Sequence, residues 1–441
     1  YGESLPYGEK ILIMEGGRIK LQKIGEVVEK RVPAKVLSFD QHGKAVFAEI
    51  KNHIKHGCTS PIYEVRTRTG RKIRVTGYHS LFTLDGNAVK SIRTSQLVPG
   101  VSYVAVPSRA VFAQEPVEKL DFLSWLAGDD HGLRVKDAQG ILRQCIRKLG
   151  EAEACRILGI RNGGYLRRVI RANVGVRAAK FLRLAARAGM EFDHGSVSVC
   201  AGKKKLPGQI RMDESLALFL GLWVAEGSYN RKDTVRLSTS QKEVAKIAGL
   251  CRRLFGHLTI YKKGDGRGRD MYIGSRVLYV FMRHFLGLED GAEKKGVPQI
   301  AFSFSEESMA AFLRGYFSGD GSVYENRKGF GTVEASTVSK ELADQLLYLL
   351  LYFGIVGRVY GKKERLGLPS SRICLTGDPL RRFSQRIGFL DAEKNARLGR
   401  CASLGSWHRG HRLPISGALR DFVMLEMPDY AKCESIGKEV L

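Results

Sequence analysis

Alternating apolar and polar residues dominate the first hundred positions of the chain. Short runs such as KVLSFD (35–40), AVFAEI (45–50), YEVRTRTG (63–70) and RKIRVTG (71–77) are separated by Gly and Asp. Alternation with a period of two, in short runs bounded by turn residues, is typical of half-buried strands. The pattern therefore predicts an all-β region over residues 1–107.

The periodicity changes to that of helices further along, over about 120–192. There the chain is rich in Ala, Leu and Arg, and EAEACRILGIRNGGYLRRVI places apolar residues at helical spacing on both sides of Gly159. This spacing predicts a helix-turn-helix whose second helix carries Arg161, Arg167 and Arg168 toward DNA. An ordinary helical hairpin with a solvated basic face is the alternative. We assign 108–205 to a helical insert, and GKKKLPGQI (202–210) to a basic linker.

Residues 210–305 and 306–400 show the same order of predicted elements twice. ALFLGLWVAEG (217–227) and AFLRGYFSGDG (311–321) each form an apolar run that ends in an acid and a glycine. Each run is followed by strand-like segments, an amphipathic helix, more strands and a further helix. Duplication of one αββαββα unit explains both halves. Residues 401–441 are left as a C-terminal extension.

Small residues recur four positions apart in both apolar runs, on one face of each predicted helix. These residues are Gly221 and Ala225 in the first helix, and Gly315 and Gly319 in the second. Side chains this small allow two helix backbones to approach closely, which would place Glu226 and Asp320 at adjacent C-terminal ends. A lone copy of the pattern is usually a packing helix with a solvated end, but two copies favour a shared site.

Two carboxylates placed together repel each other, and the negative ends of the helix dipoles add to the repulsion. A divalent cation relieves it, and hard oxygen ligands that retain water suit Mg²⁺. A metal held between carboxylates and a phosphodiester can activate water and stabilise the leaving oxygen. Glu226 and Asp320 therefore predict a magnesium site for phosphodiester hydrolysis.

The composition adds a polyanionic partner to this picture. Lys and Arg outnumber Asp and Glu by 72 to 45, a formal net charge of +27, which favours nucleic acid over an inert basic surface. No apolar run approaches the ~18 residues of a membrane span, and no signal peptide opens the chain. The eight scattered cysteines contain no CxxC pair, which argues against a zinc cluster or disulfide framework and fits the cytoplasm.

The segments FLGLWVAEG and LRGYFSGDG resemble the two signature helices of single-chain LAGLIDADG (dodecapeptide, DOD-type) homing endonucleases. This resemblance implies a monomer with internal pseudo-twofold symmetry that cuts both strands of a long site in double-stranded DNA, with Glu226 and Asp320 as metal ligands. It also implies a catalytic lysine near the scissile phosphate, which maps to Lys295 and, in the second half, to Lys394. Gln241 stands where the family often has a polar residue that contacts metal or water.

The segment WLAGDDHG (125–132) shares several letters with the motif LAGLIDADG, after which the family is named, but it is not a third copy of the motif. Its acids come too early in the motif, and the spacing of its small residues fails. We interpret Asp129 and Asp130 as a turn or helix-start cluster.

The segment RVTGYHSLFTL places Thr76 and His79 in a T-x-x-H arrangement at the end of a predicted strand. This arrangement resembles the second conserved block of inteins, whose Thr and His assist the first acyl shift. The resemblance makes Ser4 the nucleophile and residues 1–107 a Hint-like splicing region joined to host (extein) segments. Alternatively, Ser4 is an ordinary serine and the true first residue is missing.

The ending KCESIGKEVL lacks the His-Asn that inteins use to release the downstream host segment, so we expect a C-terminally incomplete splicing domain. The predicted fold class is α+β and multidomain. The favoured function is an intein-encoded homing endonuclease. A nuclease-inactive DNA-binding protein and a self-processing intein fragment with a passenger nuclease stay open.

Overall fold

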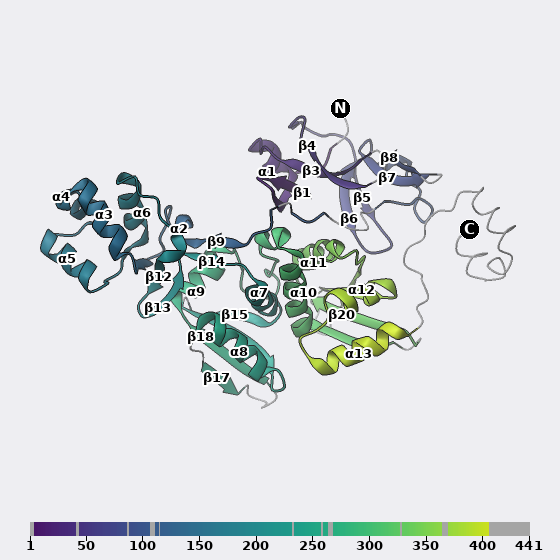
Figure 1. Ribbon diagram of the computed structural model, residues 1–441. Coiled ribbons are helices and arrows are strands. Elements are labelled where there is room, and N and C mark those ends of the chain that lie inside the picture. Colours follow the sequence, from purple (N-terminus) through teal and green to yellow (C-terminus); the bar gives the residue numbers. More distant parts are fainter. Residues whose placement is uncertain are drawn as a thin grey trace. The chain divides into compact units, whose positions relative to one another are not determined.

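A computed structural model describes residues 4–40, 44–85, 88–105, 111–113, 115–231, 233–256, 259–262, 268–326, 329–363 and 369–404. The chain divides into two compact units (Figure 1). One unit comprises Tyr1–Pro116 with Gly321–Leu441, and the other comprises Val117–Asp320. Across the described residues, no helix is long and apolar enough to cross a membrane.

The N-terminal part of the first unit is built mainly from antiparallel strands, as predicted. A four-stranded sheet has the order β2-β1-β3-β4, and two separate hairpins pair β5 with β6 and β7 with β8. The strands are β1 (Lys10–Glu15), β2 (Arg18–Lys23), β3 (Lys35–Phe39), β4 (Ala45–Glu49), β5 (Ile62–Arg66), β6 (Lys72–Thr76), β7 (Ser80–Asp85) and β8 (Ala88–Arg93).

The region is not purely β, because a short helix, α1 (Ile24–Glu29), follows β2. A helix of under two turns is too short to show a helical period in its sequence. It contributes Val27 to a small core with Ile13, Val32 and Ala34.

The first unit also contains most of the second repeat. Its sheet has the order β19-β20-β22-β21. The elements are β19 (Gly321–Glu325), β20 (Gly331–Thr337), α11 (Lys340–Tyr352), β21 (Arg358–Lys363), β22 (Pro369–Thr376), α12 (Asp378–Arg386) and α13 (Ala392–Ser403).

The turn between β5 and β6 lies against the edge strand β21. The amide of Val359 donates to the carbonyl of Thr69 at 2.8 Å. Gly70 has φ +85, and a Cβ there would stand 1.8 Å from the carbonyl oxygen of Val359. Glycine is therefore required at this close approach, both for its positive φ and for its missing side chain.

In the second unit, the first repeat has the same element and strand order as the second, β15-β16-β18-β17. Both repeats thus run in the order helix, two strands, helix, two strands and helix, while the duplication of one unit stays a prediction. The elements of the first repeat are α7 (Glu214–Glu226), β15 (Gly227–Asn230), β16 (Thr234–Ser240), α8 (Val244–Phe255), β17 (Thr259–Lys262), β18 (Gly268–Gly274), α9 (Arg276–Val280), a π-helical turn (Phe281–Phe285) and a 3-10 turn (Gln299–Ser303). Helix α10 (Glu306–Asp320), the first element of the second repeat, also belongs to this unit.

Among the helices that the structure describes, α7 and α10 make the most extensive contact with each other. Helix α7 is apolar on all sides and buried from Leu216 to Ala225, apart from the half-buried Leu218, as expected of a helix at the centre of a core. A Cβ at Gly221 would stand 1.9 Å from the carbonyl oxygen of Phe312 on α10. A Cβ at Gly315 would stand 2.4 Å from the carbonyl oxygen of Leu218 on α7. The two backbones therefore touch directly, as the small residues predicted.

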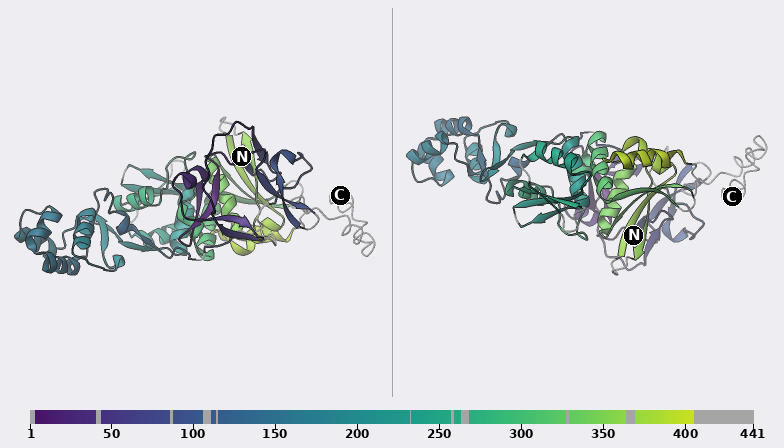
Figure 2. Two further views of the ribbon diagram at one scale, coloured as in Figure 1. Left: turned by 90° about the horizontal axis from the view of Figure 1, so that it is seen from above. Right: turned by 90° about the horizontal axis from the view of Figure 1, so that it is seen from below.

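The insert mixes helices with strands, and its helices stand apart from the sheet of the first repeat in Figures 1 and 2. A four-stranded sheet has the order β11-β10-β12-β13, and β14 pairs with β9. The elements are β9 (Lys119–Asp121), α2 (Phe122–Trp125), β10 (Arg134–Lys136), α3 (Gln139–Leu149), α4 (Glu151–Leu158), α5 (Gly163–Arg171), β11 (Val176–Arg177), α6 (Ala178–Arg187), β12 (Ser198–Ala201), β13 (Lys204–Pro207) and β14 (Gln209–Arg211).

Two expectations about the insert are corrected by these strands. The helical texture did not reveal the sheet, because its strands are only two to four residues long. The expected linker 202–210 is wrong: Lys204–Pro207 pairs with β12 and Gln209–Arg211 pairs with β9. Leu206 is buried while Lys205 points to solvent. The lysines that made this segment look like a linker therefore lie on the solvated face of a strand.

We predict that Gly221→Ala destabilises the second unit by about 1–3 kcal/mol, the usual cost of overpacking. The added methyl would meet a backbone oxygen, which no side-chain rotation can relieve. Thermal and urea unfolding measure the effect. Gly249→Ala on α8 is the matched control, because its methyl would meet only the end of the Arg253 side chain at 3.7 Å. Equal destabilisation by both changes would contradict the close helix contact.

Asp137 anchors the insert by accepting hydrogen bonds from Ser198, Asn173 and Lys205. These bonds lower the pKa of the carboxyl to about 2, against roughly 3.9 in an unfolded chain. Because the folded pKa is the lower one, the stabilisation is complete above about pH 4 and is lost as the pH falls through about 2.

We therefore predict that Asp137→Asn lowers the free energy of unfolding at neutral pH, and that the difference from the wild type shrinks as the solution is acidified toward pH about 2. Urea unfolding across this pH range measures the difference. Lys205→Met, which removes one of the three partners, should show a smaller effect in the same direction. A loss that is constant with pH would show that the carboxylate charge is not responsible.

Candidate functional site

The two predicted acids lie at the C-terminal ends of the central helix pair. Glu226 is the last residue of α7, and Asp320 is the last residue of α10. A Cβ at Gly319 would stand 2.6 Å from the Cβ of Ala225 and 3.0 Å from the Cγ of Glu226. The side chain of Glu226 therefore lies against the residue that directly precedes Asp320, and the helix contact brings the two ends together as predicted.

Lys295 reaches this pair of helix ends from the loop before α10. Its Nζ donates to the carbonyl oxygen of Ala225 at 2.7 Å and lies 5.8 Å from the ring centre of Trp223. Burial lowers the pKa of the Lys295 ammonium, while the charges of Asp320 and Glu226 oppose that shift. The predicted lysine thus stands within electrostatic range of both acids, partly withdrawn from water, where a positive charge acts strongly on a bound anion.

Tyr316 and Trp223 surround the site, and the sequence analysis did not identify them. Both side chains are fully buried, and within the described residues the Trp223 indole nitrogen has no hydrogen-bond partner. Burial raises the pKa of the Tyr316 phenol well above its usual value, and the Asp320 carboxylate raises it further. In the sequence, only their places in the motif helices could have identified them: Tyr316 stands four residues before Asp320, and Trp223 stands three residues before Glu226.

Lys394 holds a comparable place in the first unit. Its Nζ donates to the carbonyl oxygen of Gly321 at 3.0 Å, directly after Asp320 in the chain, and lies 5.6 Å from the ring centre of Phe389. Each repeat therefore has one lysine bonded to a backbone carbonyl next to its acid. Gln241 lies in an exposed turn directly after β16, and its predicted role stays a prediction.

The donor set available to a metal consists of oxygen ligands. In the part of the chain that is described, no group of three or more His, Cys, Asp and Glu side chains could hold a metal ion. Two carboxylates at adjacent helix ends fit a hard cation that keeps several waters and takes further oxygens from phosphate, as Mg²⁺ does. They do not fit a closed site built by the protein alone.

The insert contains two helices joined by a short turn at the predicted place, an arrangement that a DNA-binding helix-turn-helix and an ordinary helical hairpin share. Gly159 ends α4 in the left-handed conformation, and the Asn162 side chain caps α5 by accepting from the amide of Tyr165. The placement of Arg161 on the second helix is wrong, because that residue lies in the turn. Arg167 pairs with Glu151 on α4 at 2.7 Å.

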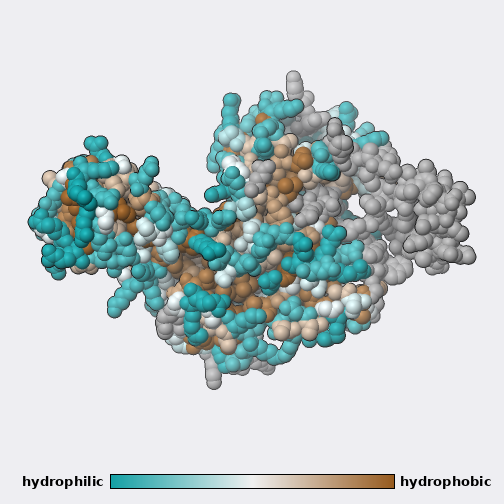
Figure 3. Space-filling view, in the orientation of Figure 1, coloured by the Kyte–Doolittle hydropathy of each residue, from teal (hydrophilic) through white to brown (hydrophobic). Residues whose placement is uncertain are grey.

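Arg168 is exposed on α5, four residues after the exposed Gly164 and three after Tyr165. From Arg134 to Arg211 the sequence has 18 Lys and Arg against 5 Asp and Glu. The visible face of the insert carries many hydrophilic side chains in Figure 3. The insert therefore presents the excess positive charge expected of a surface that meets phosphates.

The structure brings two of the three predicted splicing residues together. The Ser4 amide donates to Thr76 Oγ1 at 3.0 Å, and Thr76 Oγ1 lies 3.3 Å from the Ser4 carbonyl oxygen. The Thr76 amide also donates to that carbonyl at 3.1 Å. His79 donates its amide to the Thr76 carbonyl at 3.1 Å. The predicted C-terminal ending lies outside the described residues.

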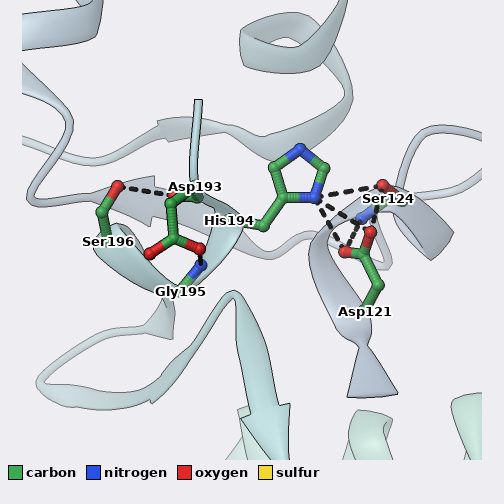
Figure 4. A network of polar contacts seen from close by, with 6 residues as sticks. All are labelled: Asp121, Ser124, Asp193, His194, Gly195 and Ser196. Atoms are coloured by element: carbon green, nitrogen blue, oxygen red, sulfur yellow. Dashed lines mark hydrogen bonds and ion pairs between the residues drawn. The ribbon is translucent and has the colours of Figure 1, made fainter. Parts of the chain in front are cut away.

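A serine, a histidine and an aspartate also meet in the insert (Figure 4). His194 Nδ1 lies 2.9 Å from Asp121 Oδ1 and 3.2 Å from Ser124 Oγ. A catalytic triad uses both ring nitrogens, one for the serine and one for the carboxylate. Here a single nitrogen meets both partners, and Asp121 also caps α2, so the cluster joins the turn at 194–196 to that helix. Asp129 and Asp130 lie in a turn, as expected, and Asp130 pairs with Arg177.

A comparison with protein families matches the two parts of the chain that carry the acids. Residues 213–285 and 307–388 each match the sequence model of the LAGLIDADG-like domain. The chain contains a LAGLIDADG-like domain. The two matched stretches begin at the first turns of α7 and α10, so the LAGLIDADG-like domain includes both acid-bearing helices.

Polymerase proteins are similar to most of the chain. The DNA-directed RNA polymerase subunit Rpo1C of Methanocaldococcus jannaschii is 24% identical over 420 residues, which cover 91% of this chain and 40% of that protein. A DNA polymerase of Thermococcus kodakarensis is 26% identical over 428 residues, 79% of this chain and 24% of that protein. The chain thus spans less than half the length of these relatives.

Two solved structures show similarity limited to part of the chain. I-DmoI in complex with DNA and Mn aligns with a TM-score of 0.30 and 18% identity over 40% of this chain and 96% of that chain. Full-length DUF199/WhiA from Thermatoga maritima aligns with a TM-score of 0.29 and 16% identity over 51% and 69%. At TM-scores this low, neither alignment supports a conclusion about this chain.

Proposed function

We propose that the chain is an intein-encoded homing endonuclease that hydrolyses both strands of a specific double-stranded DNA site. The observation that carries this proposal is the direct contact of α7 with α10, which brings the ends bearing Glu226 and Asp320 together beside Lys295. Two acids gathered at the negative ends of two helices are unfavourable unless a cation joins them. A net charge of +27 favours a nucleic acid as the substrate.

The roles of the residues follow from their chemistry. Glu226 and Asp320 would hold Mg²⁺, which when bound supplies an activated water and stabilises the leaving oxygen. Lys295 would neutralise charge on the phosphate, since its ammonium is held by the Ala225 carbonyl next to the acids. Lys394 would do the same for the second half. Arg168 and its neighbours in the insert would contact phosphates outside the cleaved step.

An intein origin accounts for the pattern of relatives. Most of this chain matches between a quarter and two fifths of each polymerase, as expected of a segment that interrupts a longer host protein. The contact between Ser4 and Thr76 favours the second candidate function, self-processing. A DNA-binding protein without nuclease activity is the remaining alternative, because Glu226 differs from the aspartate at the equivalent position, Asp320.

We predict that Glu226→Gln and Asp320→Asn each lower the rate of DNA cleavage at least ~10- to 100-fold. The loss of a residue that only supports a metal ligand already has an effect of this size. The assay uses the host gene without the intein, with Mg²⁺ as the cation. DNA binding should persist in both variants, and thermal stability without metal should be unchanged or higher because a like-charge contact is removed. Undiminished cleavage by both variants would remove the assigned centre, and tight binding without cleavage by the wild type would favour the DNA-binding protein.

The self-processing function predicts cleavage before Ser4. Attack of Ser4 Oγ on the preceding carbonyl forms an ester, breaks the peptide C–N bond and leaves the Ser4 amine free. Hydroxylamine would then take the acyl group and release residues 1–3, which intact-mass spectrometry detects. Thr76→Val should slow the release, because Thr76 Oγ1 contacts the departing nitrogen, whereas the matched change Thr83→Val should not. If hydroxylamine releases nothing from the wild type, the Ser4–Thr76 contact is only structural.

A further inference from the structure

The sheets of the two repeats, β15-β16-β18-β17 and β19-β20-β22-β21, each have one apolar and one polar face. In β16, Val235 and Leu237 are buried, and helices α7 and α9 contact this strand. In β22, Ile373 and Leu375 are buried in the same way beneath α11 and α12. Because side chains alternate along a strand, the residues between these positions point to the opposite face of each sheet.

On the polar face of the first sheet, an arginine is held by an acid on the neighbouring strand. Arg236 Nη2 donates to Asp270 Oδ2 at 2.7 Å, and Asp270 Oδ1 accepts from Ser238 at 2.7 Å. The Asp270 side chain is 11% exposed and the Arg236 side chain is 33% exposed. The guanidinium also lies 6.0 Å from the ring centre of Tyr272. The acid is covered, whereas part of the arginine faces solvent.

On the polar face of the second sheet the same kind of pair occurs. Arg372 Nε lies 2.9 Å from Glu334 Oε1, and Glu334 Oε2 accepts from the Tyr324 hydroxyl at 2.7 Å. The Glu334 side chain is 11% exposed and the Arg372 side chain is 22% exposed. In this pair too, the carboxylate is held on two sides, and the arginine side chain is the more exposed of the two.

The two pairs occupy equivalent positions with the charges exchanged. Leu237 pairs with Met271 across β16 and β18, and Ala335 pairs with Ile373 across β20 and β22. One residue earlier on each strand stand Arg236 and Asp270 in the first sheet, and Glu334 and Arg372 in the second. The arginine therefore lies on the second strand of the first repeat but on the fourth strand of the second repeat.

We propose that Arg236 and Arg372 are specificity-determining residues, each of which reads one guanine through its exposed guanidinium edge. This proposal rests on the proposed function, since it concerns the DNA site of that endonuclease. A guanidinium whose orientation is set by a covered carboxylate loses little entropy when it binds, and its planar fork matches the O6 and N7 acceptors of guanine. Arginine on guanine is the commonest specific contact in the major groove.

The exchanged charges have a consequence for the target. Strands β16 and β18 are neighbours in their sheet, as are β20 and β22, and neighbouring strands lie ~4.8 Å apart. The arginine of one repeat is thus displaced by one strand from the equivalent place in the other. Each repeat would therefore read its guanine from a different strand of its own sheet, so the two base contacts are not equivalent by the internal repeat.

Selection from a randomised duplex library, followed by sequencing, tests the proposal by binding alone. Arg236→Ala should lower the preference for guanine at one base pair by about 10- to 100-fold and leave the other positions unchanged. Arg372→Ala should do the same at one base pair in the other half of the site. Arg253→Ala on α8 and Arg382→Ala on α12 remove the same charge from exposed helical positions and should leave both preferences unchanged.

The exchange of partners gives a sharper test. Arg236→Asp combined with Asp270→Arg keeps the ion pair but moves the guanidinium to β18, the arrangement found in the second repeat. Base preference should shift to a different base pair in that half of the site, while stability stays near the wild type. If the cross-strand ion pair has only a structural role, the exchanged variant should keep its stability, and its base preference should stay that of the wild type.

The outcomes separate the two proposals. A wild-type protein that selects no sequence from the library overturns the proposed function. A wild-type protein that selects a site, together with arginine variants that keep every preference, overturns this inference and leaves the proposed function standing. A uniform loss of affinity for all sequences would assign both arginines to phosphates and also overturns the inference.

Discussion

The close approach of two helix backbones is the constraint on which the rest of the structure depends. Gly221 and Gly315 allow α7 and α10 to touch, since a Cβ at either position would enter the space of a carbonyl oxygen on the other helix. Most helix pairs in proteins keep their axes 8–10 Å apart because side chains stand between them. Removing those side chains sacrifices apolar burial at the contact. In return, the ends of the two helices and their acids are brought together.

This arrangement concentrates charge where packing alone would exclude it. Glu226 and Asp320 end two helices whose dipoles are negative at that point, and Lys295 is drawn into the same place although burial disfavours its charge. The buried side chains of Tyr316 and Trp223 belong to the same two helices. A fold selected for stability alone would not gather these groups, so their presence together is typical of a functional site.

Much of this was predictable because it depends on local periodicity. The strands of residues 10–93, the two halves with the same order of elements and the helix-turn-helix all follow from patterns within short windows. Elements too short to show a period were missed, namely α1 and the strands of the insert. The basic segment 202–210 was misassigned, because the pairing that makes it two strands comes from residues elsewhere in the chain. Arg161 was predicted on the second helix but lies in the turn before it, because a periodic pattern does not fix the exact residue at which a helix begins.

The sequence by itself determined the identity of the acid-bearing helices, since the same pattern of small residues and a final acid occurs in both halves. It also determined the lysines, Thr76 and Ser4 as candidates, because each stands in a recognisable short motif. Only the tertiary structure decided that Lys295 donates to the Ala225 carbonyl and that Arg236 and Arg372 are held by acids on neighbouring strands. Those contacts join residues far apart in the chain. Their geometry is set by strand register and helix packing, which no local pattern encodes.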